Sequence, residues 1–320
     1  MNAKHLTSLS VENFRGFRRL ELREFAAVNL VVGQNNAGKT SFLEAIAALV
    51  APNQIDEHST QLHLVSHAGR DRNLRWLLAD GSEEATLRGS LDGGAAKVSI
   101  FRKSSTADKE PGQKTFTVGE WRGTSLQPDG TKHKVRIISL QAAAAETMVA
   151  RFADAVRPPK QQRMLEALLA AVDPRIRDAR LDVDPRGTFI AMDLGLSERL
   201  PLSQAGQGIH RLVEIFADLL GAPPTICLID EIETGLHHTA LRQMWTGIAE
   251  VSSALGIQVF ATTHSQECLE AARRVFVDED PENEKDFAVI QLMRIESGIV
   301  GKVLNEHRIE AALENAIELR

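Results

Sequence analysis

The chain of 320 residues contains no tyrosine, only two cysteines and only 5% aromatic residues. Two cysteines are too few for a disulfide framework, and Cys227 and Cys268 lack the spacing of metal-binding cysteine motifs. No run approaches the roughly 18 apolar residues of a membrane-spanning helix, and the first residues lack the apolar centre of a signal peptide. These absences predict a cytoplasmic protein with no membrane partner.

The charge balance also argues against a general nucleic-acid-binding surface. The net charge is −6, whereas neutralising phosphate groups requires a basic face. A local basic patch remains open. The 43% hydrophobic and 25% charged residues are typical of a globular protein, and the length suits one large domain carrying an insertion.

Residues 33–40 read GQNNAGKT, the complete phosphate-binding pattern G-x-x-x-x-G-K-[ST]. An apolar strand is predicted over 28–32 before it and a helix over 39–50 after it. Backbone N–H groups of such a loop and the helix N-terminus point at phosphates, while the lysine reaches the β- and γ-phosphates and the hydroxyl holds Mg²⁺. We therefore predict ATP and Mg²⁺ as cofactors, with these loop residues in the binding site: Gly33, Asn35, Asn36, Ala37, Gly38, Lys39, Thr40 and Ser41.

Alternating strands are expected over 6–11 and 17–22 before the loop. After the first helix, residues 54–134 lose helical periodicity and contain glycine-rich turns, which predicts a β-rich insertion with strands over 85–91, 98–102 and 114–118. A mobile loop is expected around 104–114. The insertion is mildly basic, which fits either a solvated surface or a nucleic-acid contact.

Helix and strand patterns alternate in the second half of the chain, which is typical of an α/β fold with a parallel sheet covered by helices. The ATPase core is therefore expected over 1–53 and 135–320, with a helical part over 142–220. The elements expected there are strands 135–140, 176–183, 189–194, 225–229, 258–261, 287–294 and 298–304, and helices 142–156, 160–172, 209–220 and 306–319.

The second half of the nucleotide site is predicted at residues 226–231, ICLIDE. A buried strand ends there in two carboxylates, at the edge where open α/β sheets bind ligands. Asp230 is expected to hold Mg²⁺, and Glu231 to act as the base that polarises the attacking water. Strands often end in acidic turns, so the two carboxylates alone are weak evidence. Together with the phosphate loop at Gly33 they indicate a nucleotide site.

Three further features accompany this strand. His264 ends the next predicted strand, where it is either structural or a sensor of the γ-phosphate. Residues 233–237, ETGLH, are expected to contact a second copy of the chain. Residues 201–208, PLSQAGQG, open a helix and form a second anion-binding helix N-terminus.

Together these motifs resemble the ABC-type ATPases of the SMC, RecF and OLD (overcoming lysogenisation defect) group. The similar stretches are NFRGF at 13–17, the phosphate loop, LSQAGQG at 202–208, IDE at 229–231 and TTHS at 262–265. The tract from Leu228 to Ala272 is especially similar to stand-alone OLD-like ATPases. The resemblance implies a P-loop ABC-ATPase head with a mixed sheet and flanking helices.

The resemblance implies a homodimer in which the phosphate loop of one head and the signature helix of the other sandwich each ATP. Ser203, Gly206, Gln207 and Gly208 would contact the γ-phosphate held by the partner's loop. Which glycine does so is open, because the signature departs by one residue from Leu-Ser-Gly-Gly-Gln. By the same resemblance Arg15 approaches the phosphates or ribose, Phe14 or Phe17 supports the base, and Gln141 contacts the metal, although chance placement of that glutamine is an equal alternative.

These observations favour an ATP-hydrolysing dimeric switch that controls a separate effector, such as a nuclease or toxin in anti-phage defence. The effector step rests on family analogy alone. A second hypothesis is an ATP-dependent DNA-binding repair module resembling RecF, which the basic insertion favours and the net charge opposes. A third is an assembly scaffold with negligible turnover. A transporter ATPase fits poorly, because no membrane coupling is visible.

Overall fold

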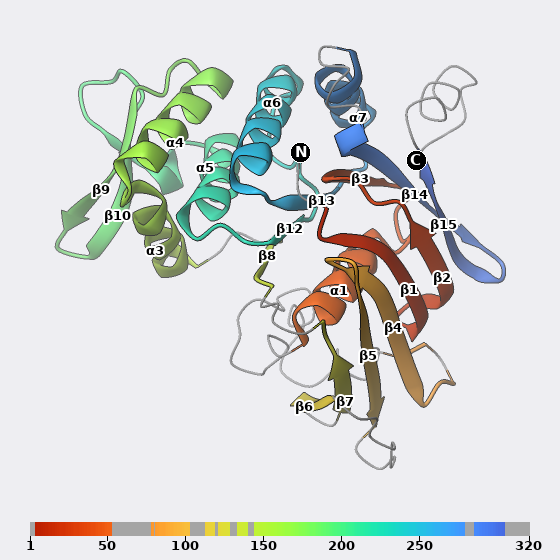
Figure 1. Ribbon diagram of the computed structural model, residues 1–320. Coiled ribbons are helices and arrows are strands. Elements are labelled where there is room, and N and C mark those ends of the chain that lie inside the picture. The colour runs from red at the N-terminus through yellow and green to blue at the C-terminus, as the bar shows by residue number, and fades with distance from the viewer. Residues whose placement is uncertain are drawn as a thin grey trace.

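The computed structural model describes residues 4–52, 78–79, 81–102, 113–118, 121–128, 133–139, 144–278 and 285–304. The fold is built around two six-stranded sheets, one mostly parallel and one antiparallel. A lobe of helices with a small third sheet lies on the side of the molecule away from the antiparallel sheet (Figure 1). Gln141, residues 104–112 of the loop expected over 104–114, and the expected helix over 306–319 lie outside the described residues.

The first sheet carries the nucleotide motifs. Its order is β15-β14-β3-β13-β12-β8, and every neighbouring pair is parallel except β14 with β15. This confirms the expected α/β fold. The strands span Val28–Val32 (β3), Val135–Ile138 (β8), Ile226–Ile229 (β12), Gln258–Thr262 (β13), Phe287–Ile295 (β14) and Gly298–Leu304 (β15).

This sheet is buried on both faces, as expected of central parallel strands. In β12, Cys227 and Ile229 face one hydrophobic core while Ile226 and Leu228 face the other. Helix α1 packs on the second face, and the remaining helices pack on the first. The helices are Lys39–Val50 (α1), Ala145–Val156 (α3), Pro159–Val172 (α4), Gln207–Gly221 (α5), His238–Leu255 (α6) and Gln266–Arg273 (α7), which continues into a π-helical turn at Arg274–Asp278.

The second sheet is antiparallel, in the order β2-β1-β4-β5-β7-β6. Its strands are Leu6–Phe14 (β1), Phe17–Arg23 (β2), Glu84–Leu91 (β4), Gly94–Arg102 (β5), Lys114–Val118 (β6) and Trp121–Leu126 (β7). Helix α1 lies between the two sheets (Figure 1), where Phe42 packs against Phe25, in the segment between β2 and β3, and against Phe260 of β13.

The strands expected within 54–134 are therefore confirmed in type, but they do not stand apart from the core. β4 pairs with β1, placing Leu87 opposite Val11, so the described part of this segment extends the N-terminal hairpin into one sheet over α1. Without β4 the edge of β1 would be open, and pairing with β4 satisfies the backbone N–H and C=O groups along that edge. The limit at 54 falls outside the described residues, and the limits at 54 and 134 stay a prediction.

The helical lobe contains α3, α4 and a small sheet of Asp178–Asp184 (β9), Gly187–Asp193 (β10) and Leu200–Pro201 (β11). Proline at the start of α4 suits the first helical turn, where the missing N–H has no partner to lose. A 3₁₀ turn at Leu202–Gln204 then leads into α5. No helix in the described part of the chain is long and apolar enough to cross a membrane.

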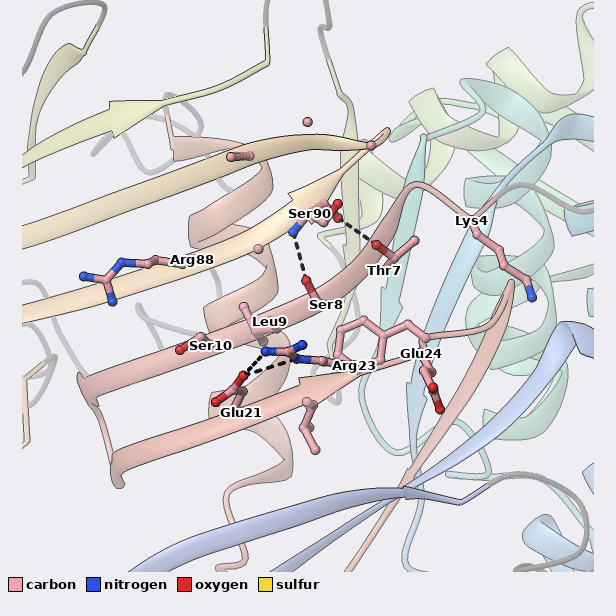
Figure 2. A pocket seen from close by; sticks show the side chains of 16 residues that line it. Lys4, Thr7, Ser8, Leu9, Ser10, Glu21, Arg23, Glu24, Arg88 and Ser90 are labelled. Carbon is pink, nitrogen blue, oxygen red and sulfur yellow. Dashed lines mark hydrogen bonds and ion pairs between the residues drawn. The ribbon is translucent and has the colours of Figure 1, made fainter.

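A hollow of about 820 Å³ lies on the polar face of the second sheet. Figure 2 shows its lining on β1, β2 and β4, where Arg23 pairs with Glu21 at 2.6 Å and Ser8 accepts a hydrogen bond from the Ser90 amide at 3.1 Å. The hollow carries none of the nucleotide motifs, which lie on the first sheet.

Candidate functional site

The phosphate loop joins β3 to α1 and is held in shape by its glycines and by β14. A Cβ on Gly33 would lie 2.3 Å from the Leu292 carbonyl oxygen, and Gly38 has φ +87° with a Cβ position 2.7 Å from Ile299. Other residues are excluded at both positions by contact or by backbone strain. Arg294 of β14 donates from Nε to the Asn36 carbonyl at 3.0 Å. The conformation of the loop is therefore stabilised by contacts with β14 as well as by the glycines of the loop itself.

Lys39 lies across this loop. Its ammonium group donates to the carbonyl oxygens of Gly33 at 2.7 Å and Gln34 at 3.2 Å. Burial lowers the pKa of Lys39, while the carboxylates of Glu231, Asp230 and Glu233 act in the opposite direction. A cation held by neutral carbonyls can exchange these partners for the oxygens of a phosphate group, with which it interacts more strongly.

Asp230 joins three elements at the carboxyl edge of the parallel sheet. Thr40 at the start of α1 donates to its Oδ2 at 2.9 Å, and Thr262 at the end of β13 donates to its Oδ1 at 2.6 Å. Asp230 is 7% exposed. The predicted metal residues Thr40 and Asp230 are thus brought together, although they are 190 positions apart in the chain.

Glu231 follows directly and has an unusual backbone. Its φ of +46° is rare for a residue with a side chain, and such outliers gather at functional sites. Its N–H donates to Thr262 Oγ1 at 2.8 Å, which holds this conformation. Its carboxylate is half-buried and lies near enough to influence the Lys39 ammonium.

His264 lies two residues beyond β13. Its N–H donates to Glu233 Oε1 at 3.0 Å, and its Nδ1 lies 3.2 Å from the same oxygen, with 52% of the side chain exposed. The histidine is therefore fastened to the loop that follows the acidic pair, while much of its ring stays accessible. Its role as a γ-phosphate sensor stays a prediction.

The signature stretch forms an exposed helix start. Gly206 is the N-cap of α5, and Ser203, Gly206 and Gln207 are exposed, while Gly208 is half-buried. Among the described residues, no hydrogen bond or ion pair joins 203–208 to the phosphate loop. Within one chain, the start of α5 and the phosphate loop are therefore not joined by a polar contact.

Arg15 has a different partner from the one expected. Its Nε lies 2.8 Å from Glu44 Oε2, and its Nη2 donates to Oε1 at 3.0 Å, which ties the β1–β2 turn to α1. Arg15 also lines a hollow of about 990 Å³ beside the phosphate loop, together with Arg18, Ser41 and Arg294. Its approach to the phosphates or ribose stays a prediction.

The expectation for Phe14 and Phe17 is wrong. They are 1% and 0% exposed and belong to the core under the second sheet. Neither ring offers a free face to a base, because the inward-facing positions of β1 and β2 pack on α1.

Sequence reasoning assigned no role to three residues that shape the site: Thr262, Arg294 and Arg211. Arg211 of α5 is 6% exposed and donates to the carbonyl oxygens of Asp230 at 2.6 Å and Ser139 at 2.8 Å. Thr262 could have been found as a polar residue at the buried carboxyl end of a parallel strand. The two arginines act through backbone carbonyls, for which the sequence carries no local signal.

The residues present fit a Mg²⁺–triphosphate group. The donors at Thr40 and Asp230 are a hydroxyl and a carboxylate, the oxygen ligands that Mg²⁺ prefers beside phosphate oxygens. Loop amides, Lys39 and the N-terminus of α1 supply the positive potential that phosphates need. When bound, the metal would neutralise charge on the phosphates.

The chain is similar in sequence to known proteins. Residues 28–270 match the family model described as "AAA domain, putative AbiEii toxin, Type IV TA system". An ATP/GTP phosphatase of Helicobacter pylori is 23% identical, covering 88% of this chain and 90% of that one. A DNA replication and repair protein RecF of Leptospira interrogans is 26% identical, covering 78% and 69%.

Solved structures show the same fold. An SmcHead bound to the C-winged helix domain of ScpA superposes with a TM-score of 0.61 at 14% identity, covering 97% of this chain and 100% of that one. The head of Pyrococcus furiosus Smc, bound to the C-terminal domain of ScpA, gives a TM-score of 0.59 at 12% identity, with 99% of both chains covered.

Fold, site and comparisons together define a P-loop ATPase of the ABC type, in the SMC and RecF group. The family model covers more than half of the chain, so the protein belongs to the family of AAA domains that this model describes.

The ion pair at Arg15 generates a pH prediction. Burial raises the pKa of Glu44 to about 7, against the attraction of Arg15. Between the ordinary value of 4.5 and 7, the folded chain holds a proton that the unfolded chain releases, so the free energy of unfolding falls as pH rises through this window. Each unit of pKa difference corresponds to about 1.4 kcal/mol.

Glu44→Gln removes this contribution, and thermal unfolding between pH 5 and 7 becomes less dependent on pH than in the wild type. Glu21→Gln is the matched control, because Glu21 is surface-exposed and its pKa is lowered by Arg23, so its own effect falls at more acidic pH. A Glu44→Gln profile parallel to that of the wild type would contradict the assignment.

Proposed function

We propose that the protein is a dimeric ATP-driven switch, in which two copies close on ATP and hydrolysis reopens them. The observation that carries the proposal is the pairing, in one chain, of a braced phosphate loop with a separate exposed helix start at 203–208. Thr40, Asp230 and Lys39 form one half of a triphosphate site. The free N-terminus of α5 is suited to the other half, supplied by the second copy.

The chemistry proposed is transfer of the γ-phosphoryl group to water. Glu231 accepts a proton from the attacking water, and Lys39 and Thr40 hold the phosphate chain. ADP and inorganic phosphate are the products. His264 contacts the γ-phosphate through its ring, so that loss of this group would change the contact between His264 Nδ1 and Glu233 Oε1. Opening after hydrolysis follows because the partner's α5 loses the group that it bound.

Glu231→Gln is expected to lower the ATPase rate by at least about 100-fold, because it removes the base. ATP binding is retained, since Lys39 and the loop are unchanged, and the variant accumulates as an ATP-bound dimer. Steady-state hydrolysis, ATP affinity and light scattering measure the three effects. Glu250→Gln, an exposed change on α6, is the control and behaves as wild type. Undiminished hydrolysis in Glu231→Gln would remove the proposed base.

A mixing experiment tests whether the site is shared between chains. Lys39→Ala disables the phosphate loop, and Ser203→Arg places a bulky side chain at the exposed signature turn, so each variant alone is inactive. In a heterodimer of the two, one site combines an intact loop with an intact signature helix. Random pairing makes about half of the dimers mixed, each with one of two sites intact, so an equimolar mixture should recover about a quarter of the wild-type rate.

The control for this experiment is a mixture in which both changes reside on the same chain, paired with wild type in the same ratio. A mixture of the single variants that hydrolyses no faster than its components would contradict the shared site. So would full activity of Ser203→Arg alone.

We infer that a separate chain reads the state of the dimer, and that the protein acts in the cytoplasm. The family description names a type IV toxin–antitoxin system, which supports an effector of the toxin or nuclease kind in anti-phage defence. The Smc heads with the same fold are solved with a domain of ScpA bound, which supports a protein partner. We also propose that the protein is OLD-like, on the basis of the tract 228–272.

A DNA-binding repair module is the second candidate, favoured by the RecF relative that aligns with 78% of the chain. It predicts duplex DNA binding that requires ATP and weakens steeply with salt, because phosphate contacts release counterions. Fluorescence anisotropy with wild type and Lys39→Ala measures it, and the variant should lose the ATP-dependent part. No binding at low salt with ATP would eliminate this candidate and leave the protein-partner switch.

A further inference from the structure

Three side chains from distant segments meet at the amino ends of the parallel strands, opposite the nucleotide edge. His5 precedes β1, Asp92 lies in the β4–β5 turn, and His133 lies two residues before β8. His5 Nδ1 is 2.8 Å from Asp92 Oδ1, and His133 Nε2 is 3.2 Å from Asp92 Oδ2. One ligating atom from each residue lies within 4.8 Å of the other two. None of these residues takes part in the nucleotide site.

The hydrogen bonds of His5 leave its Nδ1 without a proton to donate when the ring is neutral. His5 Nε2 is 3.0 Å from the Gly256 carbonyl oxygen, which can only accept a hydrogen bond, so Nε2 carries the proton. A neutral imidazole has one N–H, and Nδ1 then presents a lone pair to a carboxylate oxygen at 2.8 Å. Two acceptors at this distance repel each other unless a positive centre lies between them.

His133 supplies the second, independent observation. Its side chain is 5% exposed, and among the residues that the structure describes its Nε2 has no hydrogen-bond partner, although it is directed at Asp92. Buried polar atoms are normally hydrogen-bonded, so an unpaired nitrogen at such a place indicates a group that the protein alone does not provide.

We propose that His5, Asp92 and His133 bind a divalent transition metal of the zinc type. Two imidazoles and a carboxylate are ligands that Zn²⁺ takes readily. Ligand atoms around a tetrahedral zinc are separated by roughly 3.3 Å, given bonds of about 2.0–2.1 Å. The two imidazole nitrogens lie 2.8 and 3.2 Å from Asp92, each from a different oxygen of its carboxylate, and one atom of each residue lies within 4.8 Å of the other two. The Gly256 carbonyl fixes the His5 ring as a backbone acceptor commonly does for a metal-bound histidine.

The site is accessible to solvent on the side of His5 and Asp92. Lys4 and Gly93, the chain neighbours of His5 and Asp92, line the hollow shown in Figure 2. His5 and Asp92 have side chains 21% and 34% exposed. Water can therefore complete the coordination from this side, while His133 closes the other.

The position indicates what the metal does. Asp92 belongs to the second sheet, His133 leads into the first sheet, and His5 is bonded to the end of α6 at Gly256. A metal bound to all three fastens the two sheets to each other at the end remote from ATP. The expected consequence of binding is greater stability, since the bound metal favours the folded chain.

The test uses the full chain without an affinity tag or nucleotide, after dialysis against a chelator. Co²⁺, the spectroscopic probe, should bind one per chain with the visible absorption of a four-coordinate nitrogen-containing site, and Zn²⁺ should displace it and raise the melting temperature. Asp92→Asn keeps the size and the left-handed turn conformation, φ +48°, and His133→Gln removes the buried ligand. Each should weaken Co²⁺ binding by at least about 100-fold, because even outer-shell changes cost 10–100-fold.

Asp184→Asn, the same change at the end of β9, is the matched control and should bind metal as wild type does. The proposal is overturned if wild type shows no Co²⁺ absorption, or if both ligand variants bind as tightly as wild type. It is equally overturned if Asp92→Asn lowers the melting temperature of a chain that binds no metal, because His5 and Asp92 would then form a simple imidazolium–carboxylate pair.

Discussion

The carboxylate of Asp230 is the point on which the nucleotide site depends. It accepts hydrogen bonds from Thr40 at 2.9 Å and Thr262 at 2.6 Å, while Arg211 binds its backbone carbonyl at 2.6 Å. These contacts fasten α1, β13 and α5 to the end of β12. A buried carboxylate is costly unless its oxygens are satisfied. Here the groups that satisfy it also position the phosphate loop, the acidic strand and the signature helix.

The two hydrophobic cores extend this arrangement through the molecule. Each face of the parallel sheet packs on its own core, with α1 on one face and α3 to α7 on the other. Helix α5 also carries a buried polar group, because Asp218 pairs with Arg151 at 2.7 Å. Burial raises the pKa of Asp218 to about 6. The helical lobe is therefore joined to the nucleotide edge by directional contacts, and a change at Asp230 can reach it through Arg211.

Motifs that act through nearby sequence could be predicted, and contacts between distant segments could not. The loop at 33–40, the strand ending at Asp230 and the helix opened by Gly206 each carry a local pattern, and the structure has these elements at the expected places. The partner of Arg15 and the burial of Phe14 depend on the second sheet folding over α1. The pairing of β4 with β1 and the meeting of His5 with His133 depend on topology as well, for which a single sequence gives no register.

The claim that two copies complete one ATP site is tested most directly by cross-linking. Cys227 and Cys268 are both buried, and burial raises the pKa of Cys268 to about 12, so the natural thiols give little background. A chain carrying Asn35→Cys and Ser203→Cys is treated with a short thiol-specific cross-linker, with and without ATP. The account predicts covalent dimers that form only with ATP. Cross-linking confined within single chains, or dimers that form equally well without nucleotide, would contradict it.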